Sequence, residues 1–463
     1  EEATRRRLGA QEIQVQKVSQ VSQARPAKGT RDFAAAEVLK RRHVVGVLQS
    51  VFERYGFGPL ETPSFENLDT LMGKYGEEGD RLIFKILRSG DFMKSVANPA
   101  QPKASELADK ALRYDLTVPF ARYVAQNAGQ LAMPFRRYQI QPVWRADNPQ
   151  KGRFREFYQC DADVVGSTSL WQEVELVAMY HEAFAALGLD VTVRINHRGL
   201  LAGIAEVAGL GDQLIAFTVA LDKLDKVGAD GVRAEWRERG FTEAQCAALE
   251  PALQSSGDAH EALAQMEAWL LGSEVGLKAV SELKWLMERA SKTGAVALDC
   301  TLARGLNYYT GCIFEVQAKG VAMGSVGGGG RYDNLTGIFG VSGLSGVGIS
   351  FGLDRIVLCL EELNLLPEVA AGPQVLVVQF SEAEADYAFR VASDLRAVGV
   401  RTVLYPEPAK IKKQFDHAER IGAQWVALTG ANEEAHDVVQ LKNLSTGEQH
   451  QVARSGLGAF NWN

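Results

Sequence analysis

The chain has 463 residues, of which 46% are hydrophobic and 23% charged, and its formal net charge is −7. This length predicts roughly two to four domains of a globular protein, because it exceeds what one ordinary core holds. The acidic balance excludes a globally basic nucleic-acid coat but not a local basic patch, and no apolar run approaches the roughly 18 to 20 residues that span a bilayer.

The cysteines, the histidines and the N-terminal residues argue against several kinds of site. The five cysteines are scattered without CxxC spacing, which favours a reducing, cytoplasmic compartment over disulfides or structural zinc. The seven histidines show no HExxH or paired spacing, so we expect no transition metal held by the protein. Residues 1–22 lack the apolar segment of a secretory signal and are expected to form a polar tail or one loose helix.

The first predicted elements are a helix and a β-hairpin. Apolar residues at helical spacing predict a helix over 34–55, which the glycines and prolines of 56–63 end before a short strand. Residues 81–98 predict a β-hairpin with its turn at 89–91.

Three polar residues alternate before the next predicted helix. Arg113, Asp115 and Thr117 would share one face of a short strand, and Pro119 would lie in the first turn of the helix. A carboxylate and a hydroxyl at this spacing can accept hydrogen bonds from an ammonium group. A helix cap or a structural ion pair is the alternative.

The segment 142–166 predicts two strands joined by a basic loop. The first strand ends at Arg145, and in the second Gln159, Asp161 and Asp163 recur at period two, which predicts that they share one face. Such a hairpin suits an anionic ligand together with a cationic or N–H-bearing one. A surface hairpin with solvated charges is the alternative.

The middle of the chain is predicted to be mostly helical. Residues 170–187 predict an amphipathic helix, and 190–196 a strand. Residues 199–290 are rich in alanine and leucine and show no catalytic spacing, which predicts an inserted helical subdomain.

Glycines and aromatic residues mark the sheet that resumes after residue 295. Tyr308 and Tyr309 follow Arg304 around a turn, where they would line a pocket or form a surface pair. The glycines of 327–330 would let a ligand approach the backbone or would simply make a turn, and they fit neither phosphate-binding signature. Arg355, one turn into the following helix, can reach a bound polyphosphate.

Residues 366–373 predict a linker. Beyond it the order β-α-β-α-β with two closing strands predicts a separate small α/β domain.

The order of these motifs resembles that of class II aminoacyl-tRNA synthetases. The Pro-ended strand after a long helix, the hairpin with Arg145 and the helix with Arg355 correspond to the three motifs of that class. The segments 112–117, 303–311 and 327–335 resemble signature elements of the histidyl-tRNA synthetase family, and the likeness runs from about Arg25 to the C-terminus.

The resemblance implies an α+β catalytic core, an antiparallel sheet flanked by helices, with a helical insertion and a C-terminal α/β domain. The implied boundaries are 1–22 for the tail, 23–198 and 291–366 for the catalytic domain, 199–290 for the insertion and 373–463 for the anticodon-binding domain. It also implies a homodimer, without membrane association, that acts on ATP, L-histidine and tRNA(His) with Mg²⁺.

The resemblance further implies how ATP would bind. Adenine would lie between Phe157 and Arg355, and Arg145 and Arg304 would lie on opposite sides of the α-phosphate. Attack of a carboxylate on the α-phosphorus builds negative charge that two guanidiniums stabilise, so no side-chain nucleophile is required. The phosphates, rather than protein ligands, would mainly hold Mg²⁺.

The remaining implied contacts concern histidine and tRNA. The histidine-binding residues would be Asp115, Leu116, Thr117, Gln159, Asp163, Tyr308 and Tyr309, with Asp163 and one of the tyrosines on the imidazole nitrogens. The loop residues Asn148, Gln150, Lys151 and Arg153 would contact the acceptor end of the tRNA. Asp161 receives no role.

Small departures from the family pattern leave the finer hydrogen bonding open. Asn307 stands where many relatives carry Asp, Gly328 where Ala is common, and Asp115 where some bacterial forms have Glu. The main alternative function is a catalytically silent regulatory paralogue of histidine biosynthesis, which predicts loss of the catalytic arginines and of the anticodon domain. Both are present in this sequence. A stand-alone nucleotide- or tRNA-binding module and a synthetase of another specificity are further alternatives.

Overall fold

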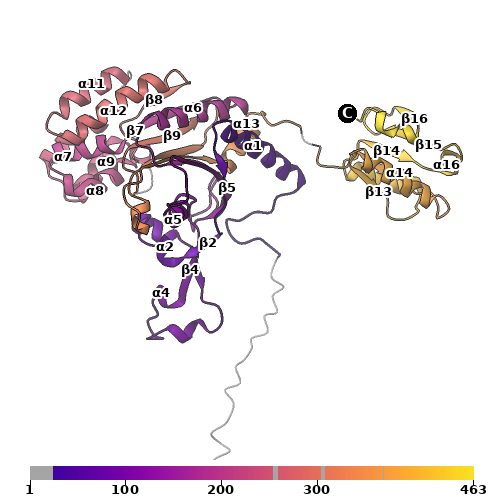
Figure 1. Cartoon of the computed structure of the whole chain (residues 1–463), viewed down its shortest axis with the longest axis horizontal. Coiled ribbons are helices and arrows are strands. Elements are labelled where there is room, and N and C mark those ends of the chain that lie inside the picture. The colour runs from indigo at the N-terminus through magenta and orange to yellow at the C-terminus, as the bar shows by residue number, and fades with distance from the viewer. Residues whose placement is uncertain (1–23, 254–258, 304–307, 369, 463) are drawn as a thin grey trace, which may run out of the picture.

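The computed structural model describes residues 24–253, 259–303, 308–368 and 370–462, and structural statements below concern these residues. In Figure 1 the main body contains a large sheet covered by helices, and a smaller α/β domain lies apart from it at the C-terminal end. The expected N-terminal tail and the predicted catalytic residue Arg304 lie outside the described residues. In the described ranges, no helix is both long and apolar enough to cross a bilayer.

An eight-stranded sheet forms the centre of the body, in the order β1-β5-β6-β11-β10-β9-β7-β8. Its strands are β1 (Gly58–Pro59), β5 (Phe135–Trp144), β6 (Glu156–Val165), β7 (Val191–His197), β8 (Val296–Leu298), β9 (Cys312–Ala318), β10 (Gly327–Tyr332) and β11 (Gly346–Gly352). Only the two edge pairs, β1 with β5 and β7 with β8, are parallel. The predicted α+β core is confirmed, with an antiparallel centre and parallel edges.

One face of this sheet is apolar and is covered by helices. Cys160 and Ala162 of β6 lie in one buried cluster with residues of α1 (Ala35–Arg54), α6 (Trp171–Ala186) and α13 (Leu353–Glu362). The helices predicted over 34–55 and 170–187 are therefore confirmed to within one residue at each end. Because side chains alternate along a strand, the neighbouring residues of β6 face the opposite side of the sheet.

The region between β7 and β8 is helical, as predicted. Its helices are α7 (Arg198–Val207), α8 (Leu214–Leu221), α9 (Leu224–Glu238), α10 (Glu243–Leu249), α11 (Ala259–Trp269) and α12 (Glu274–Ala290). At the crossing of α7 and α12, a Cβ at Gly203 would lie 2.5 Å from the Cα of Gly276, so only glycine permits this close contact. The buried residues of these helices join the cluster that lies on the main sheet.

The predicted hairpin over 81–98 is wrong. A three-stranded sheet in the order β2-β4-β3 pairs β3 (Lys85–Leu87) instead with β4 (Ala108–Leu112), with β2 (Phe65–Asn67) on the other side. After the turn, the side chain of Asp91 accepts a hydrogen bond from the backbone N–H of Met93 and starts a 3₁₀ helix. This local capping competes with strand pairing, and the chain becomes extended again only at β4.

The predicted strand over 113–117 is also wrong. β4 ends at Leu112, and Thr117 is already the first residue of α5 (Thr117–Asn127). Asp115 accepts a hydrogen bond from the backbone N–H of Val118, in the first turn of that helix, at 3.2 Å. The hydrogen bond from Val118 to Asp115 thus starts a helix where the alternation of polar residues had predicted a strand. Pro119 lies in the first turn of this helix, as expected.

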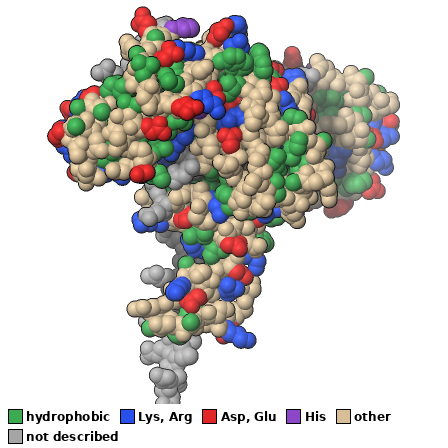
Figure 2. All heavy atoms as spheres, turned by 60° about the vertical axis from the view of Figure 1, so that its left-hand side comes forward, with side chains coloured by type: hydrophobic (Ala, Val, Ile, Leu, Met, Phe, Trp, Pro, Cys, Tyr) green, Lys and Arg blue, Asp and Glu red, His purple; other side chains and the backbone are tan. Residues whose placement is uncertain are grey.

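The remaining short helices of the body are α2 (Leu68–Leu71), α3 (Gly76–Leu82) and α4 (Ala104–Leu107), with 3₁₀ turns at Phe92–Ser95, Gly211–Gln213, Glu250–Leu253 and Thr336–Phe339. Figure 2 shows basic and acidic side chains interspersed over the visible face of the molecule.

The C-terminal domain has the predicted α/β order. It contains β12 (Val375–Val377), α14 (Ala385–Ala397), β13 (Thr402–Leu404), α15 (Ile411–Arg420), β14 (Trp425–Leu428), α16 (Ala431–Ala435), β15 (Val438–Asn443), β16 (Gln449–Ala453) and a final 3₁₀ helix (Arg454–Ala459). The sheet order β13-β12-β14-β15-β16 is parallel for the first three strands and antiparallel for the last two. Separate buried clusters lie on its two faces, as expected of an independent domain.

Candidate active site

Polar side chains gather on the sheet face that α1 and α6 leave free, and we call this polar surface of β5, β6 and β11 the floor. Gln159, Asp161 and Asp163 of β6 share this face, as predicted. The register places Gln141, Gln139 and Arg137 of β5 opposite them on one side, and Gly352, Ser350 and Gly348 of β11 on the other. Such a concentration of buried polar groups is costly unless they are paired with each other or with a ligand.

Asp163 is held by an arginine and a tyrosine. Its Oδ2 lies 2.9 Å from Nη2 of the fully buried Arg137, and its Oδ1 accepts a hydrogen bond from the Tyr332 hydroxyl at 2.6 Å. Burial raises the pKa of Asp163, and the Arg137 guanidinium opposes this shift. A Cβ at position 348 would lie 1.9 Å from Asp163 Oδ1, so Gly348 is the residue that leaves space for this carboxylate.

Asp115 lies at the start of α5, where two tyrosines hold its carboxylate. The hydroxyl of Tyr75 donates to Oδ1 at 2.9 Å, and that of Tyr308 donates to Oδ2 at 3.0 Å. Burial raises the pKa of Asp115, and Arg145 is near enough to oppose the shift. The structure thus brings the predicted residues Asp115 and Tyr308 into direct contact, with the Thr117 hydroxyl bonded to Tyr308.

Gln159 and Asp161 each have an acceptor without a partner. The amide nitrogen of Gln159 donates to the Ser350 hydroxyl at 3.1 Å, and its buried Oε1 accepts no hydrogen bond from the described residues. Asp161 is 2% exposed, and its Oδ1 likewise has no hydrogen-bond partner there. Burial raises the pKa of Asp161 to about 7. These two oxygens are free acceptors on the floor.

Tyr308 and Tyr309 lie edge to face with ring centroids 5.1 Å apart. Burial raises the pKa of both phenols, so each keeps its proton and can donate a hydrogen bond at neutral pH. The glycines of 327–330 belong to β10, so the alternative that they form a turn is wrong. At Gly330 a Cβ would lie 2.8 Å from the Tyr309 ring, so this glycine makes room for the tyrosine.

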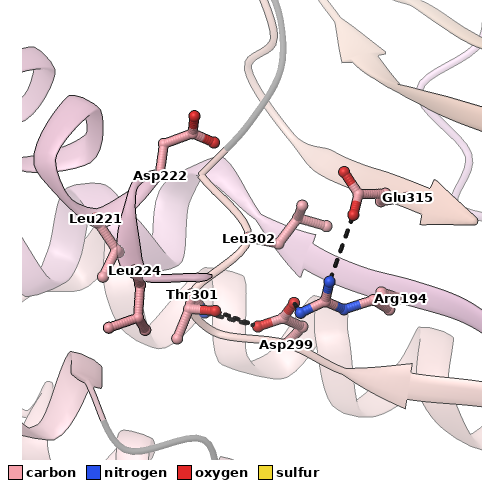
Figure 3. Close-up of a pocket in the computed structure, with 8 residues that line it drawn as sticks. All are labelled: Arg194, Leu221, Asp222, Leu224, Asp299, Thr301, Leu302 and Glu315. Atoms are coloured by element: carbon pink, nitrogen blue, oxygen red, sulfur yellow. Dashed lines mark hydrogen bonds and ion pairs between the residues drawn. The ribbon is translucent and has the colours of Figure 1, made fainter. Parts of the chain in front are cut away.

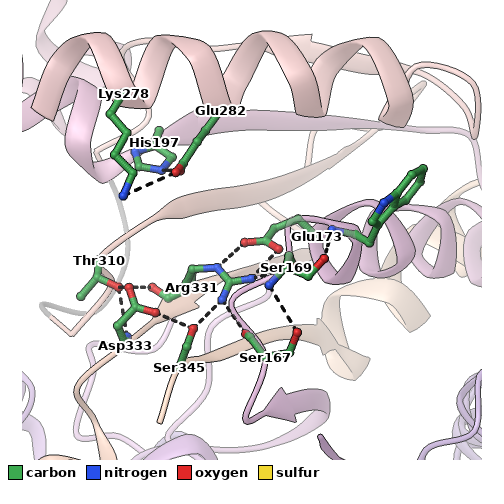
Figure 4. A network of polar contacts seen from close by, with 11 residues as sticks. Ser167, Ser169, Glu173, His197, Lys278, Glu282, Thr310, Arg331, Asp333 and Ser345 are labelled. Atoms are coloured by element: carbon green, nitrogen blue, oxygen red, sulfur yellow. Dashed lines mark hydrogen bonds and ion pairs between the residues drawn. The ribbon is translucent and has the colours of Figure 1, made fainter. Parts of the chain in front are cut away.

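A buried arginine anchors the segment that carries the two tyrosines (Figure 4). Arg331 Nε and Nη2 bind both carboxylate oxygens of Glu173 on α6 at 2.5 and 2.6 Å, and its Nη1 donates to the Ser345 hydroxyl. The backbone carbonyl of Arg331 accepts the N–H of Thr310, whose hydroxyl donates to Asp333. Because Thr310 follows Tyr309 directly, this network determines where the tyrosine pair lies.

The two predicted ATP arginines that the structure describes both contact the basic loop, Arg145 at its base and Arg355 at Gly152. Arg145 donates to the carbonyl of Tyr114 at 3.0 Å, and its guanidinium lies 5.2 Å from the ring centroid of Phe157. Arg355 donates to the carbonyls of Gly152 at 2.8 Å and of Ser325 at 2.6 Å. Phe157 is therefore next to Arg145, and Arg355 contacts the loop.

The loop residues predicted to contact tRNA are exposed. They are Asn148, Gln150, Lys151 and Arg153. Gln150 and Arg153 pair through their backbones, while Lys151 forms an exposed ion pair with Glu362 on α13 at 2.9 Å. At the base of the loop, the N–H of Arg155 donates to the carbonyl of Gly29, so the N-terminal segment of the body supports it.

A small pocket lies farther along the same sheet face, between the main sheet and the α8–α9 turn (Figure 3). In it Arg194 of β7 lies between Asp299 and Glu315 of β9, and Thr301 donates to Asp299 at 2.6 Å. Two β-strands, β9 and β10, separate Arg194 from the floor. The pocket is therefore distinct from the predicted histidine site, and its contacts hold the segment that leads toward residue 304.

Sequence reasoning missed three residues that hold the predicted ones. They are Arg137, Tyr332 and Tyr75. Arg137 was detectable, because Arg137, Gln139 and Gln141 alternate as Gln159, Asp161 and Asp163 do. The two tyrosines come from segments far away in the chain and show no such local signal.

Two family models match parts of this chain. The family model described as histidyl-tRNA synthetase matches residues 101–356, and that described as anticodon binding domain matches residues 374–460. Relatives from Flavobacterium johnsoniae and Christiangramia forsetii, both named histidine–tRNA ligase, are each 53% identical over 93% of this chain and 97% of their own length.

Solved structures show the same fold. The histidyl-tRNA synthetase from Nostoc sp. PCC 7120 has a TM-score of 0.76 and 30% identity, covering 94% of this chain and 98% of its own. A Bacillus halodurans protein titled ATP phosphoribosyltransferase regulatory subunit/histidyl-tRNA synthetase has a TM-score of 0.69 at 22% identity, covering 88% of this chain and 99% of its own, a likeness of fold alone. The match over most of the chain, together with the two matched domains, means that this chain belongs to the histidyl-tRNA synthetase family of the class II aminoacyl-tRNA synthetases.

Proposed function

We propose that this chain ligates L-histidine to tRNA(His) in two steps, with histidyl-adenylate as the intermediate. Membership in the family makes it an aminoacyl-tRNA ligase. One observation carries the assignment of the site: the buried acceptors of Asp115, Gln159 and Asp163 face the same side of the sheet as Arg145 and Phe157. Buried acceptors suit the N–H groups of an amino acid, and a guanidinium suits a phosphate.

The histidine contacts follow from the donors and acceptors present. The α-ammonium would donate to Asp115, Thr117 and the free Oε1 of Gln159, beside the backbone of Leu116. One imidazole N–H would donate to Asp163, and the hydroxyl of Tyr308 or Tyr309 would donate to the other nitrogen. A site that pairs both ring nitrogens rejects side chains of similar shape, because they leave its buried groups unpaired.

The ATP contacts require a rearrangement at the loop. We place Arg145 and Arg304 on opposite sides of the α-phosphate, where they would stabilise the charge that builds when the histidine carboxylate attacks. Adenine would lie between Phe157 and Arg355. Arg355 would then exchange its bond to the Gly152 carbonyl for the base. Mg²⁺ enters with ATP and would be held mainly by phosphate oxygens.

The partners follow from the other parts of the chain. The exposed loop residues Asn148, Gln150, Lys151 and Arg153 would contact the acceptor end of tRNA(His), and the C-terminal domain would read the anticodon. We further propose a homodimer that works in the cytoplasm. All five cysteines are buried and unpaired, which fits a reducing compartment.

The regulatory paralogue of histidine biosynthesis is not favoured. The relatives that are about half identical to this chain are named histidine–tRNA ligase. The structure titled as a regulatory subunit shares the fold at low identity, and fold alone does not distinguish the two functions.

ATP–pyrophosphate exchange with each of the twenty amino acids tests the proposal. We expect exchange with histidine alone. Arg145→Ala and Arg304→Ala should abolish exchange with the fold intact, whereas Arg54→Ala, which removes an exposed ion pair with Glu182, is the matched control. Exchange with another amino acid would refute the specificity, and near-normal exchange in the Arg304 variant would show that the active site is misplaced.

A further inference from the structure

Two carboxylates and one guanidinium are buried together in the floor, and the proposed reaction uses only one of the carboxylates. Arg137, Asp161 and Asp163 are each at most 2% exposed. Asp163 forms an ion pair with the Arg137 guanidinium and accepts a hydrogen bond from the Tyr332 hydroxyl, whereas Asp161 has the Ser350 hydroxyl. Within the described residues, Oδ1 of Asp161 and Oδ2 of Asp163 accept no hydrogen bond. The two acids are chemically alike and differ in their surroundings.

Those surroundings decide which acid keeps its charge. A buried carboxylate remains ionised only where cations and hydrogen-bond donors compensate its lost hydration. The other titratable groups that interact with Asp161 include Asp115 from the start of α5, Tyr309 from the segment before β9 and Tyr180 of α6, and none of these three supplies a positive charge. One guanidinium therefore serves two acids, and burial correspondingly raises the pKa of Asp161 to about 7.

Arg137 also connects the two halves of the proposed histidine site. Its Nη2 donates to the carbonyl of Leu116 at 3.3 Å, in the segment proposed to hold the α-ammonium, and lies beside Asp163, proposed to hold the imidazole. The ring centroid of Phe120 lies 4.2 Å from the guanidinium, which fixes its plane. The buried side chain of Arg137 therefore sets the distance between the Leu116 carbonyl and the Asp163 carboxylate.

Resting on the proposed function, we infer that Arg137 is a positioning residue for histidine and that Asp161 carries the proton that leaves Asp163 ionised. The floor then holds one negative and one positive charge. This balance suits a neutral imidazole that donates its N–H to Asp163, and it disfavours an imidazolium. Asp161, which has no contact role in the reaction, has a role in setting the charge of Asp163.

Charge-balance rescue tests the inference. The Michaelis constant for histidine in ATP–pyrophosphate exchange is measured for Arg137→Met, Asp161→Asn and the double variant. Arg137→Met should raise the Michaelis constant about tenfold or more, because Asp163 loses the cation that keeps it ionised, and a rise of about one pKa unit in Asp163 corresponds to about a tenfold change. The double variant should recover most of that loss, because a single carboxylate remains. Asp161→Asn alone should change the Michaelis constant for histidine less than about threefold.

The controls separate charge from packing. Arg113 is equally buried but bonds carbonyls and the Gln141 amide, so the defect of Arg113→Met should not be relieved by Asp161→Asn. A double variant as impaired as Arg137→Met would overturn the charge role of Asp161, and an equal rise in the Michaelis constant for ATP would overturn the positioning role of Arg137. Should Arg137→Met not fold, Arg137→Lys replaces it, with a smaller defect expected.

A second measurement does not depend on activity. In the ligand-free protein near pH 6, the infrared difference spectrum of the wild type minus Asp161→Asn should contain the carbonyl band of a protonated carboxyl group. Absence of that band overturns the assignment of the proton to Asp161, whatever amino acid the enzyme activates. Failure of histidine exchange in the wild type, in contrast, refutes the proposed function and leaves the infrared result to decide the protonation.

Discussion

Replacing Asp161 by Asn should change how the stability of the catalytic body depends on pH. Burial raises the pKa of Asp161 from 3.8 to about 7. Because the folded pKa exceeds the unfolded one, the stabilisation is complete below about pH 3.8 and is lost as the pH rises through about 7. Each pKa unit corresponds to about 1.4 kcal/mol, so the wild type should lose up to about 4 kcal/mol across this window.

Asparagine does not titrate and keeps the shape of the side chain. The stability of Asp161→Asn relative to the wild type should therefore rise steadily between about pH 4 and about pH 7.5. The chain has two separately folded parts, so a single unfolding transition is not assumed. Hydrogen exchange of peptides from β6 and β11, corrected for the intrinsic pH dependence, gives the opening free energy of the floor, and peptides from β14 are the internal control. Parallel pH profiles for the variant and the wild type would refute the electrostatic reasoning.

Three other substitutions test single contacts. Gly348→Ala places a Cβ 1.9 Å from Asp163 Oδ1, so the Michaelis constant for histidine should rise about tenfold. Gly328→Ala is its matched control, with its nearest contact at 3.4 Å, and an equal defect there would contradict the steric argument. Arg331→Met leaves a buried carboxylate of α6 uncompensated and should lower the opening free energy of α6 peptides in hydrogen exchange by about 3–5 kcal/mol; no loss would mean that the pair is not structural. Lys151→Ala removes only an exposed ion pair, so stability and ATP–pyrophosphate exchange should stay unchanged while the Michaelis constant for tRNA rises. A changed Michaelis constant for ATP with an unchanged one for tRNA would contradict the proposed contact between the loop and tRNA.

The alternation of β6 shows where sequence reasoning succeeds. A strand buried on one face requires residues of one kind at every second position, so Gln159, Asp161 and Asp163 were predictable as neighbours. The same rule applied to β5 would have found Arg137. What the rule cannot supply is the register between the two strands, which alone places Arg137 opposite Asp163.

The failures have a different cause. In 113–117 and 91–98 a side-chain oxygen satisfies a nearby backbone N–H, at Asp115 and at Asp91, and this local bond prevails over an apparent strand pattern. The partners Tyr75 and Tyr332 are distant in the chain from the acids they bind. Tyr332 reaches Asp163 because β10 and β6 both pair with β11, and Tyr75 reaches Asp115 from the residue before α3. No local pattern encodes these contacts.

The buried polar groups of the floor stabilise the centre of the sheet less than apolar residues of similar volume would. Removing one partner from a buried ion pair costs about 3–5 kcal/mol, whereas apolar residues of similar volume are often neutral or stabilising in its place. Stability therefore does not explain why Arg137, Asp161 and Asp163 occupy central strands. The unpaired oxygens of Asp161 and Gln159 add to the cost, because a buried acceptor without a donor loses its hydration. A ligand that brings N–H groups to this face offsets that cost on binding, which is the physical reason to place histidine there.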